Sequence, residues 1–400
     1  MERHLSPLSF VSEVPAYDPV ICARPEKAMA AAQWFVDNFD GDVLYAVKVN
    51  PEPWMIDAIY SAGVRWFDVA SEAELELIAE RCPEARLAFM HPVKSRRAIS
   101  RAYHEFGCNI FALDCEAELQ KIIEETGGAK DLQLIIRIKT SGAGSALPLT
   151  GKFGAAPADV PGLLRAARAY ADELGVCFHV GSQCMDPQAY RDAMADASSL
   201  IVDAGVTVDI VDVGGGFPAV YPGMTPPPLS AYMDAIHAAF EDMMVLENAD
   251  FWCEPGRAIA AEGASLLTRV DLVRDDAVFL NDGGYGALYD AVHERWAYPV
   301  RVIGADGTIK ADTECSAFRV YGPTCDSADQ FAAPLNLPAS IAEGDYVEFG
   351  NLGAYGASMA TRFNGFGDYE TVAVSDAPFA SAYAQSAEIV PFTHRRRAGG

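Results

Sequence analysis

Short apolar runs alternate with helical stretches through the first 260 residues, and this alternation constrains the fold more than any other feature. Amphipathic or Ala-rich stretches such as 26–39, 53–62 and 71–80 separate these runs. Strands that alternate with helices form parallel sheets. At least seven such units in about 230 residues predict an α/β fold, a (β/α)8 barrel over residues 25–260. The strand-like runs are 43–49, 66–69, 87–90, 110–113, 132–138, 177–180 and 208–213.

The chain changes character after residue 260. Helical patterning nearly disappears, and short strands with turns between them predict an all-β domain. The first 24 residues contain three prolines and no helical period, so they read as strand and loop. Because chain ends often lie together, we expect residues 1–24 to join residues 261–400 in this domain. The strand-like runs of this half are 270–273, 278–281, 298–303, 318–321 and 345–349.

Charge and cysteine content narrow the function classes. The 400 residues carry a formal net charge of −26, which argues against nucleic acid and against an anionic membrane surface as partners. No apolar run reaches the ~18 residues that a membrane span needs, and the N-terminus lacks a signal sequence. Nine cysteines without CxxC pairs predict neither a disulfide framework nor a metal site, which fits the cytoplasm.

One lysine ends an early strand. The segment YAVKVN places Lys48 at the C-terminal end of the strand, the end that faces the active site in a barrel. A charged amine among Val and Ala is costly, so its pKa is expected to fall, and Schiff-base chemistry needs such an amine. The alternative is a lysine that only reaches solvent from a strand end.

Three later segments carry groups suited to a flat, anionic ligand. HVGSQ offers His179 to stack on a ring and Ser182 to bind a phosphate. Gly214–Gly216 follow a strand and leave backbone N–H groups free to face an anion. EPGR offers Glu254 to a pyridine nitrogen and Arg257 to a phosphate. The plainer alternatives are a core histidine, a tight turn and an ion pair.

A last segment, GPTCD, lies in the β half. Cys325 beside Asp326 is suited to act as an acid next to a cation-binding carboxylate, or else the segment is an ordinary turn. No single motif is decisive. The order of all of them is specific: YAVKVN, FDVAS, KFG, HVGS, DVGGGFP, EPGR, NDGGYG, GPTCD and NLGAYG.

In that order the chain resembles the alanine-racemase-like, fold III pyridoxal-phosphate decarboxylases, and within them ornithine decarboxylase, from about residue 20 to 375. The resemblance implies a barrel plus a β domain and pyridoxal 5'-phosphate as cofactor. Lys48 would carry the cofactor as a Schiff base, with His179 on its ring and Glu254 at the pyridine nitrogen. The other implied cofactor-binding residues are Asp68, Arg137, Ser182, Gly214, Gly215, Gly216, Gly256, Arg257 and Tyr355.

The resemblance also implies a homodimer with shared active sites. Cys325 would protonate the carbon that loses carbon dioxide, and Asp326 would bind the distal ammonium of a basic amino acid, both in the partner's site. Diaminopimelate decarboxylases usually have Cys-Glu here and an arginine where this chain has Tyr285, so we expect L-ornithine, giving putrescine for polyamine biosynthesis. Asp290 or Glu294 would be a second substrate carboxylate, which leaves lysine open as a substrate. A diaminopimelate decarboxylase, a racemase and an inactive regulatory relative are the remaining alternatives.

Overall fold

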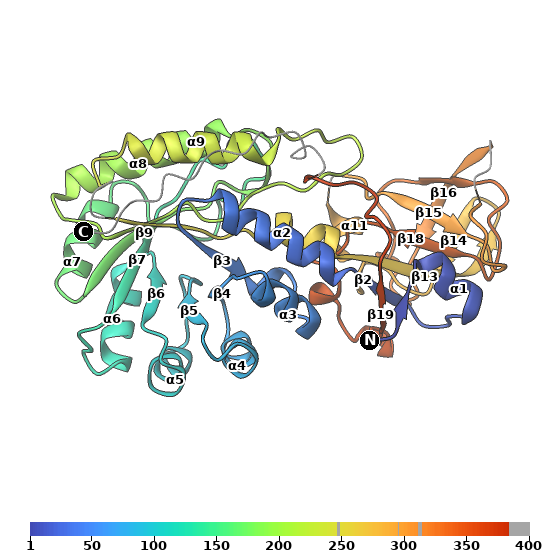
Figure 1. Cartoon of the computed structure of the whole chain (residues 1–400), viewed down its shortest axis with the longest axis horizontal. Coiled ribbons are helices and arrows are strands. Elements are labelled where there is room, and N and C mark those ends of the chain that lie inside the picture. The colour runs from blue at the N-terminus through green and yellow to red at the C-terminus, as the bar shows by residue number, and fades with distance from the viewer. Residues whose placement is uncertain (246–248, 295, 311–313, 384–400) are drawn as a thin grey trace.

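The computed structural model describes residues 1–245, 249–294, 296–310 and 314–383. Eight parallel strands close a barrel, which confirms the predicted fold class. Figure 1 shows the barrel and a second, sheet-rich region side by side along the long axis of the molecule. In barrel order the strands are β11 (Ile210–Asp212), β12 (Asp250–Cys253), β3 (Asp42–Ala46), β4 (Trp66–Val69), β5 (Arg86–Phe89), β6 (Ile110–Leu113), β7 (Gln133–Arg137) and β9 (Glu173–Cys177).

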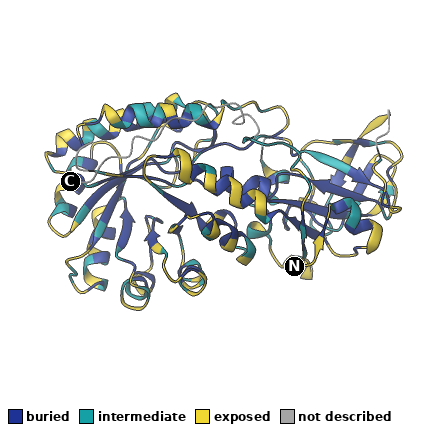
Figure 2. Cartoon of the chain, in the orientation of Figure 1, coloured by how far each residue is buried: buried dark blue, intermediate teal, exposed yellow. Residues whose placement is uncertain are grey.

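Alternation along each strand builds the two layers of the barrel. On β3, Leu44 belongs to the cluster inside the barrel, whereas Val43 and Tyr45 pack into the larger core outside it. This is the two-residue period of a strand. Outer helices cover the strands with buried inner faces and exposed outer faces (Figure 2). They are α2 (Pro25–Asn38), α3 (Pro53–Ser61), α4 (Glu72–Arg81), α5 (Arg96–Phe106), α6 (Glu116–Glu125), α7 (Val160–Arg168), α8 (Gln188–Ala204) and α9 (Leu229–Glu241).

The second region is a nine-stranded sheet. Its long central strand β13 pairs with β2, β14 and β18, so the start of the chain lies against its last third. The strands are β1 (Arg3–His4), β2 (Val20–Ala23), β13 (Ala264–Arg274), β14 (Ala277–Leu280), β15 (Val300–Ile303), β16 (Cys315–Tyr321), β17 (Leu335–Pro338), β18 (Tyr346–Phe349) and β19 (Glu370–Val374). Two short helices also occur, α10 (Arg257–Ala260) and α11 (Tyr289–His293).

Two local predictions were wrong. Helix α1 (Pro7–Glu13) forms where strand and loop were expected. Ser6 caps it, and Pro7 occupies its first turn, where the missing N–H costs nothing. The strand expected at 177–180 ends at Cys177 instead, so His179 lies on the loop that follows β9. That loop leads into a short antiparallel pair, β8 (Ser145–Leu147) with β10 (Ser182–Cys184).

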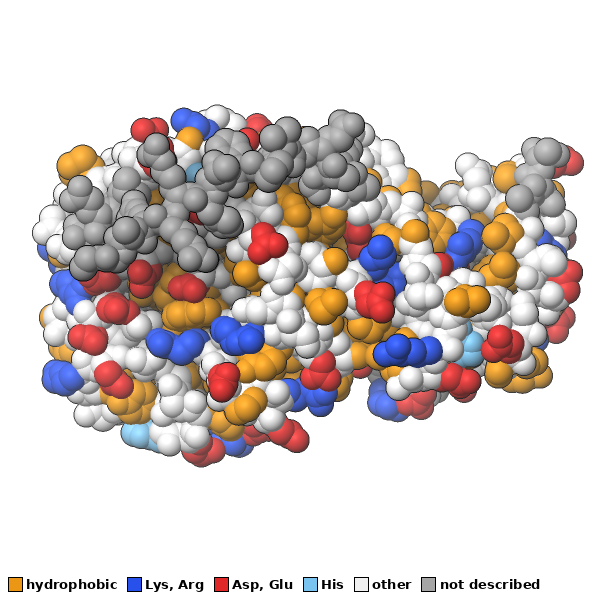
Figure 3. Space-filling view, in the orientation of Figure 1, with side chains coloured by type: hydrophobic (Ala, Val, Ile, Leu, Met, Phe, Trp, Pro, Cys, Tyr) orange, Lys and Arg blue, Asp and Glu red, His pale blue; other side chains and the backbone are white. Residues whose placement is uncertain are grey.

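The described helices include none that is both long and apolar enough to cross a membrane. On the face shown in Figure 3, acidic and basic side chains are interspersed rather than gathered into one patch. The acidic excess of the sequence is therefore spread over this face.

Candidate active site

The C-terminal ends of the barrel strands surround a pocket of about 370 Å³. Side chains from six strand ends or the loops after them meet in it, as the (β/α)8 fold requires of an active site. Seven of the predicted cofactor residues line it: Lys48, Asp68, Arg137, His179, Ser182, Glu254 and Tyr355. Apolar side chains, including Met90, Leu149 and Phe153, complete the wall.

Lys48 reaches into this pocket from a single turn of 3-10 helix, Val47–Val49, directly after β3. Its Nζ donates to Oδ2 of Asp68, on the neighbouring strand β4, at 2.5 Å. The Lys48 side chain is 43% accessible, whereas that of Asp68 is 1% accessible. The backbone N–H of Tyr355 donates to the Val49 carbonyl, which ties a loop of the second region to this turn.

The expectation of a lowered lysine pKa was wrong for this pocket. Burial lowers the pKa of Lys48, but the carboxylates of Asp68 and Glu254 more than reverse that effect, and the net pKa is raised. The sequence showed the Val and Ala neighbours of Lys48. The resemblance placed Asp68 in the cofactor pocket, but the hydrogen bond that it accepts from the Lys48 amine was not predicted.

Glu254 follows β12, and Asp212 ends β11 beside it. Burial raises the pKa of Asp212 to about 6, and burial together with Asp212 raises the pKa of Glu254 well above its usual value. Asp212 Oδ1 accepts from the Gly214 N–H at 2.8 Å, and the Glu254 N–H donates to the Gly214 carbonyl at 2.9 Å. Burial and the neighbouring Asp212 carboxylate thus favour the protonated form of Glu254 in the cofactor-free pocket. Asp212 was not predicted as a site residue, although it lies only two residues before the three glycines.

His179 presents a neutral ring. Its Nδ1 accepts from the Gly181 N–H at 3.0 Å. Burial first, and then the positive charges of Arg137 and Lys48, lower its pKa to about 3. An uncharged flat ring at this position suits stacking on another flat ring better than it suits proton transfer near neutral pH.

The Gly214–Gly216 segment packs too tightly for any side chain. Gly214 and Gly216 have φ of 68° and 110°, and a Cβ at Gly214 would lie 2.0 Å from the Phe178 carbonyl oxygen. At Gly256, a Cβ would lie 2.5 Å from Val49 Cγ2, beside the Lys48 turn. These contacts alone require glycine, so the tight-turn interpretation holds whether or not the loop also binds an anion.

Arg257 is buried and already has a carboxylate partner. Its Nη1 donates to Asp290 Oδ2 at 2.8 Å, and its Nε donates to Ser182 Oγ at 3.3 Å. Tyr298 donates its hydroxyl to the same Asp290 oxygen at 2.9 Å. The guanidinium also lies over the Tyr355 ring, 4.8 Å from its centroid. Asp290 thus faces Arg257.

The remaining predicted substrate residues lie elsewhere in the chain's own structure. Neither Asp290 nor Glu294, which follows α11, is among the residues that line the Lys48 pocket. Tyr285 donates its hydroxyl to Asp326 Oδ2 at 2.5 Å, and Cys325 is exposed. These last three residues form a second cluster, outside the lining of that pocket.

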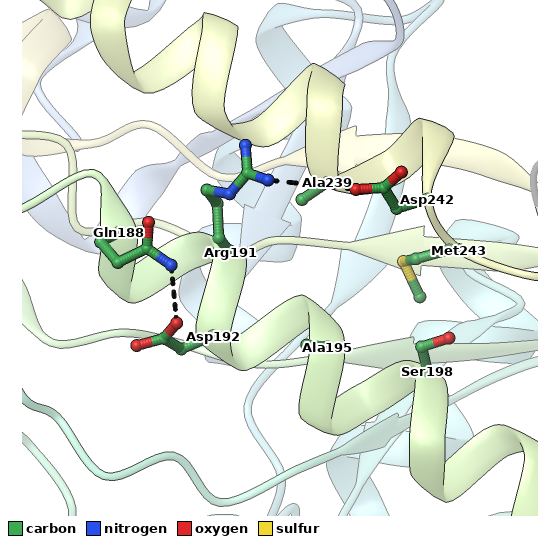
Figure 4. Close-up of a pocket in the computed structure, with 8 residues that line it drawn as sticks. All are labelled: Gln188, Arg191, Asp192, Ala195, Ser198, Ala239, Asp242 and Met243. Atoms are coloured by element: carbon green, nitrogen blue, oxygen red, sulfur yellow. Dashed lines mark hydrogen bonds and ion pairs between the residues drawn. The ribbon is translucent and has the colours of Figure 1, made fainter.

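Another cavity has fewer side chains that are suited to catalysis. This cavity, of about 390 Å³, lies between α8 and α9 (Figure 4). Its polar side chains bind one another: Gln188 donates to Asp192 at 2.7 Å, and Arg191 lies 3.9 Å from Asp242. It shares no lining residue with the Lys48 pocket, so the barrel pocket is the candidate active site.

Comparison with known proteins identifies the family. The description "Pyridoxal-dependent decarboxylase, pyridoxal binding domain" matches residues 25–261. The chain belongs to the pyridoxal-dependent decarboxylases. The decarboxylase flvG of Aspergillus flavus is 32% identical over 361 residues, covering 85% of this chain and 81% of the relative. The lysine/ornithine decarboxylase of Selenomonas ruminantium is 30% identical over 345 residues, covering 84% of each.

Solved structures agree with this assignment. The Paramecium bursaria Chlorella virus arginine decarboxylase bound to agmatine superposes with a TM-score of 0.80 at 27% identity, covering 92% of this chain and 100% of that one. The lysine decarboxylase of Selenomonas ruminantium in complex with PLP superposes with a TM-score of 0.80 at 27% identity, over 94% and 96%.

Pyridoxal phosphate is the cofactor of this family, and the pocket suits it. Lys48 supplies an accessible amine, Glu254 a buried carboxyl group and His179 a flat neutral ring. Asp68 Oδ1 is buried without a hydrogen-bond partner in the described structure. A buried oxygen of this kind is expected at a place where a ligand completes the hydrogen bonding.

Proposed function

We propose that this decarboxylase acts on a basic L-amino acid, with L-ornithine preferred, and forms putrescine and carbon dioxide for polyamine biosynthesis. The observation that carries the proposal is the accessible Lys48 amine beside Asp68, with Glu254 in the same pocket. Bound pyridoxal phosphate supplies the electron sink that accepts the electrons left behind when carbon dioxide departs.

Each pocket residue has a distinct task in this proposal. Lys48 would hold the cofactor covalently through its amine, and Asp68 would accept a hydrogen bond from that amine. Glu254 would bind the pyridine nitrogen, and its raised pKa makes its carboxylate a stronger hydrogen-bond acceptor. His179 packs its neutral ring on the cofactor, and Arg137 lines the pocket near the lysine.

The phosphate has a second group of partners. Arg257 donates a hydrogen bond to Ser182 and lies over the Tyr355 ring, so these three side chains form one connected group. Together with the backbone N–H groups of Gly215, Gly216 and Gly256, they would hold the phosphate, whereas the Gly214 N–H donates to Asp212 Oδ1. Because Arg257 already pairs with Asp290, a bound phosphate would share that positive charge.

Asp326 and Cys325 supply the substrate side. Hydrogen bonds from the Ala328 N–H and from Tyr285 lower the pKa of Asp326, so its carboxylate stays ionised and suits a distal ammonium. Cys325, next to it, would deliver the proton to the α carbon. Because neither lines the lysine pocket of its own chain, we propose that both act in the partner's pocket of a homodimer.

Ornithine is favoured over two other substrates for different reasons. A second carboxylate, as in diaminopimelate, would meet Asp326 rather than an arginine. Lysine differs by one methylene, which is worth only ~1–3 kcal/mol of discrimination. The lysine/ornithine and arginine decarboxylases among the similar proteins show that this family accepts several chain lengths.

The test is carbon dioxide release from L-ornithine, L-lysine, L-arginine and meso-diaminopimelate at equal low concentration with pyridoxal phosphate present. Preference for ornithine, abolished in Asp326→Asn but not in the exposed control Asp276→Asn, supports the proposal. Preference for lysine or arginine would support the decarboxylation reaction but would mean that the pocket takes a longer side chain than that of ornithine. Turnover of diaminopimelate alone contradicts the assignment of Asp326.

Two further results separate the alternatives. Mixing Lys48→Ala with Cys325→Ala protein should recover activity if each site uses both chains, and no recovery would exclude shared sites. An antizyme inhibitor of Xenopus laevis is 31% identical over 346 residues, so a regulatory role is the rival. It would be favoured if the purified protein showed neither cofactor absorbance nor carbon dioxide release.

A further inference from the structure

One buried carboxylate, that of Asp329, joins the two loops that carry Cys325–Asp326 and Tyr285. Its Oδ2 accepts from the Thr324 N–H at 3.1 Å and from the Thr324 hydroxyl at 2.7 Å. Its Oδ1 accepts from the Gly284 N–H at 2.8 Å. Thr324 directly precedes Cys325, and Gly284 directly precedes Tyr285.

Both loops are built closely around this side chain, which is 2% exposed. A Cβ at Gly283 or at Gly322 would lie 2.3 Å from Asp329 Oδ1. The backbone closes the same turn, because the Gly322 N–H donates to the Asp329 carbonyl and the Asp329 N–H donates to the Asp326 carbonyl. Moving the carboxylate would therefore move both loops.

A third loop holds the same segment independently. Asn364 Oδ1 accepts from the Cys325 N–H at 3.0 Å. This bond does not involve Asp329, so the Cys325 amide reports on the whole segment rather than on one lost bond.

We propose that Asp329 is a positioning residue for the reaction. It fixes the Cys325 thiol and the Asp326 carboxylate relative to the Tyr285 hydroxyl, without touching substrate itself. Its catalytic consequence rests on the proposed function. An aspartate can accept from three donors at once, whereas an asparagine amide would turn an N–H₂ toward at least one of them.

The test is Asp329→Asn in the full-length, cofactor-loaded protein, with hydrogen exchange of peptides that cover 283–286 and 322–329. We expect the Gly284, Thr324 and Cys325 amides to exchange about fivefold faster, the change expected from one lost hydrogen bond. kcat should fall about tenfold, and the ornithine-to-lysine ratio of kcat/KM should fall about fivefold as Asp326 loses its place.

A matched control is Asp345→Asn, another buried carboxylate of the same region, which accepts from the Ala342 N–H at 2.7 Å. It should leave the Cys325 amide and the substrate ratio unchanged. If Asp329→Asn does not fold, Thr324→Val, which removes one donor, should give the same changes at smaller size. Unchanged Cys325 exchange in the folded variant, or equal changes in the Asp345 control, would overturn the proposal.

The two proposals fail differently. Faster exchange in Asp329→Asn, in a protein that releases no carbon dioxide from any basic amino acid, keeps the positioning role and rejects the decarboxylase assignment. Normal exchange and an unchanged substrate ratio in Asp329→Asn, in an enzyme that releases carbon dioxide, keep the decarboxylase assignment and reject the positioning role of Asp329.

Discussion

Replacing Asp290 with alanine would remove the only carboxylate that the described structure gives to the buried Arg257. The Arg257 and Asp290 side chains are 4% and 6% accessible and 2.8 Å apart. They join α10, at the end of the barrel, to α11, in the second region. Tyr298 would lose its acceptor as well.

The expected size follows from the burial of the pair. Removing one partner of a buried ion pair costs about 3–5 kcal/mol, because the other charge stays in a poorly solvated place. The entropy of unfolding is about 2.1 cal/mol/K per residue, or roughly 0.8 kcal/mol/K for a chain of 400 residues. The melting temperature of Asp290→Ala should therefore fall by about 4–6 °C.

Thermal unfolding of the cofactor-free protein measures this, and Asp276→Ala is the control. Asp276 pairs with Arg319 on the surface, with side chains 61% and 54% accessible, so its loss should leave the melting temperature unchanged. Pyridoxal phosphate should recover part of the Asp290→Ala loss, since its phosphate gives Arg257 another anion. A melting temperature equal to that of the control, with only a raised KM for ornithine, would refute this account and restore Asp290 as a substrate residue.

Two further predictions concern titration in the cofactor-free pocket. Unfolded histidine binds a proton below pH ~6.5, but folded His179 does so only near pH 3, so this residue makes the protein less stable as pH falls through that window. As the pH is lowered from 7.5 to 5, the melting temperature of His179→Phe should therefore rise relative to that of the wild type. A difference in melting temperature that does not change with pH would contradict this. Asp212 changes stability with pH in the opposite direction, because its folded pKa of about 6 exceeds its ordinary value of 3.8. Its contribution to stability is therefore lost as the pH rises between these two values. Asp212→Asn keeps an acceptor for the Gly214 N–H, and its melting temperature should exceed that of the wild type at pH 7.5 but not at pH 4. A melting temperature below that of the wild type at both pH values would show that the buried charge of Asp212 is not destabilising.

The sequence was most informative where local pattern decides structure. The strands at 66–69 and 110–113 form as predicted, since short apolar runs between helical stretches leave few other folds. Helix α4 forms in the helical stretch expected at 71–80, and the Ser71 hydroxyl caps it by accepting from the Glu74 N–H. Helix α1 was missed because its proline was taken as a breaker rather than as a first-turn residue.

Contacts between distant segments were beyond the sequence. The pKa of Lys48 depends on Asp68, on the neighbouring strand, and this reversed the expected shift. Asp290 was predicted for the substrate, yet it faces Arg257, thirty-three residues earlier in the chain. The bridging role of Asp329 had no local signal, because only folding brings the two loops together.

Two lysines, Lys48 and Lys152, line the candidate active site, and this makes the central claim directly testable. The measurement is borohydride reduction of the protein loaded with pyridoxal phosphate, followed by peptide mass mapping. We predict a pyridoxyl group on Lys48 of the wild type and no pyridoxyl group in the Lys48→Ala variant. A pyridoxyl group on Lys152, or no modified lysine in this pocket, would contradict the assignment of the active site.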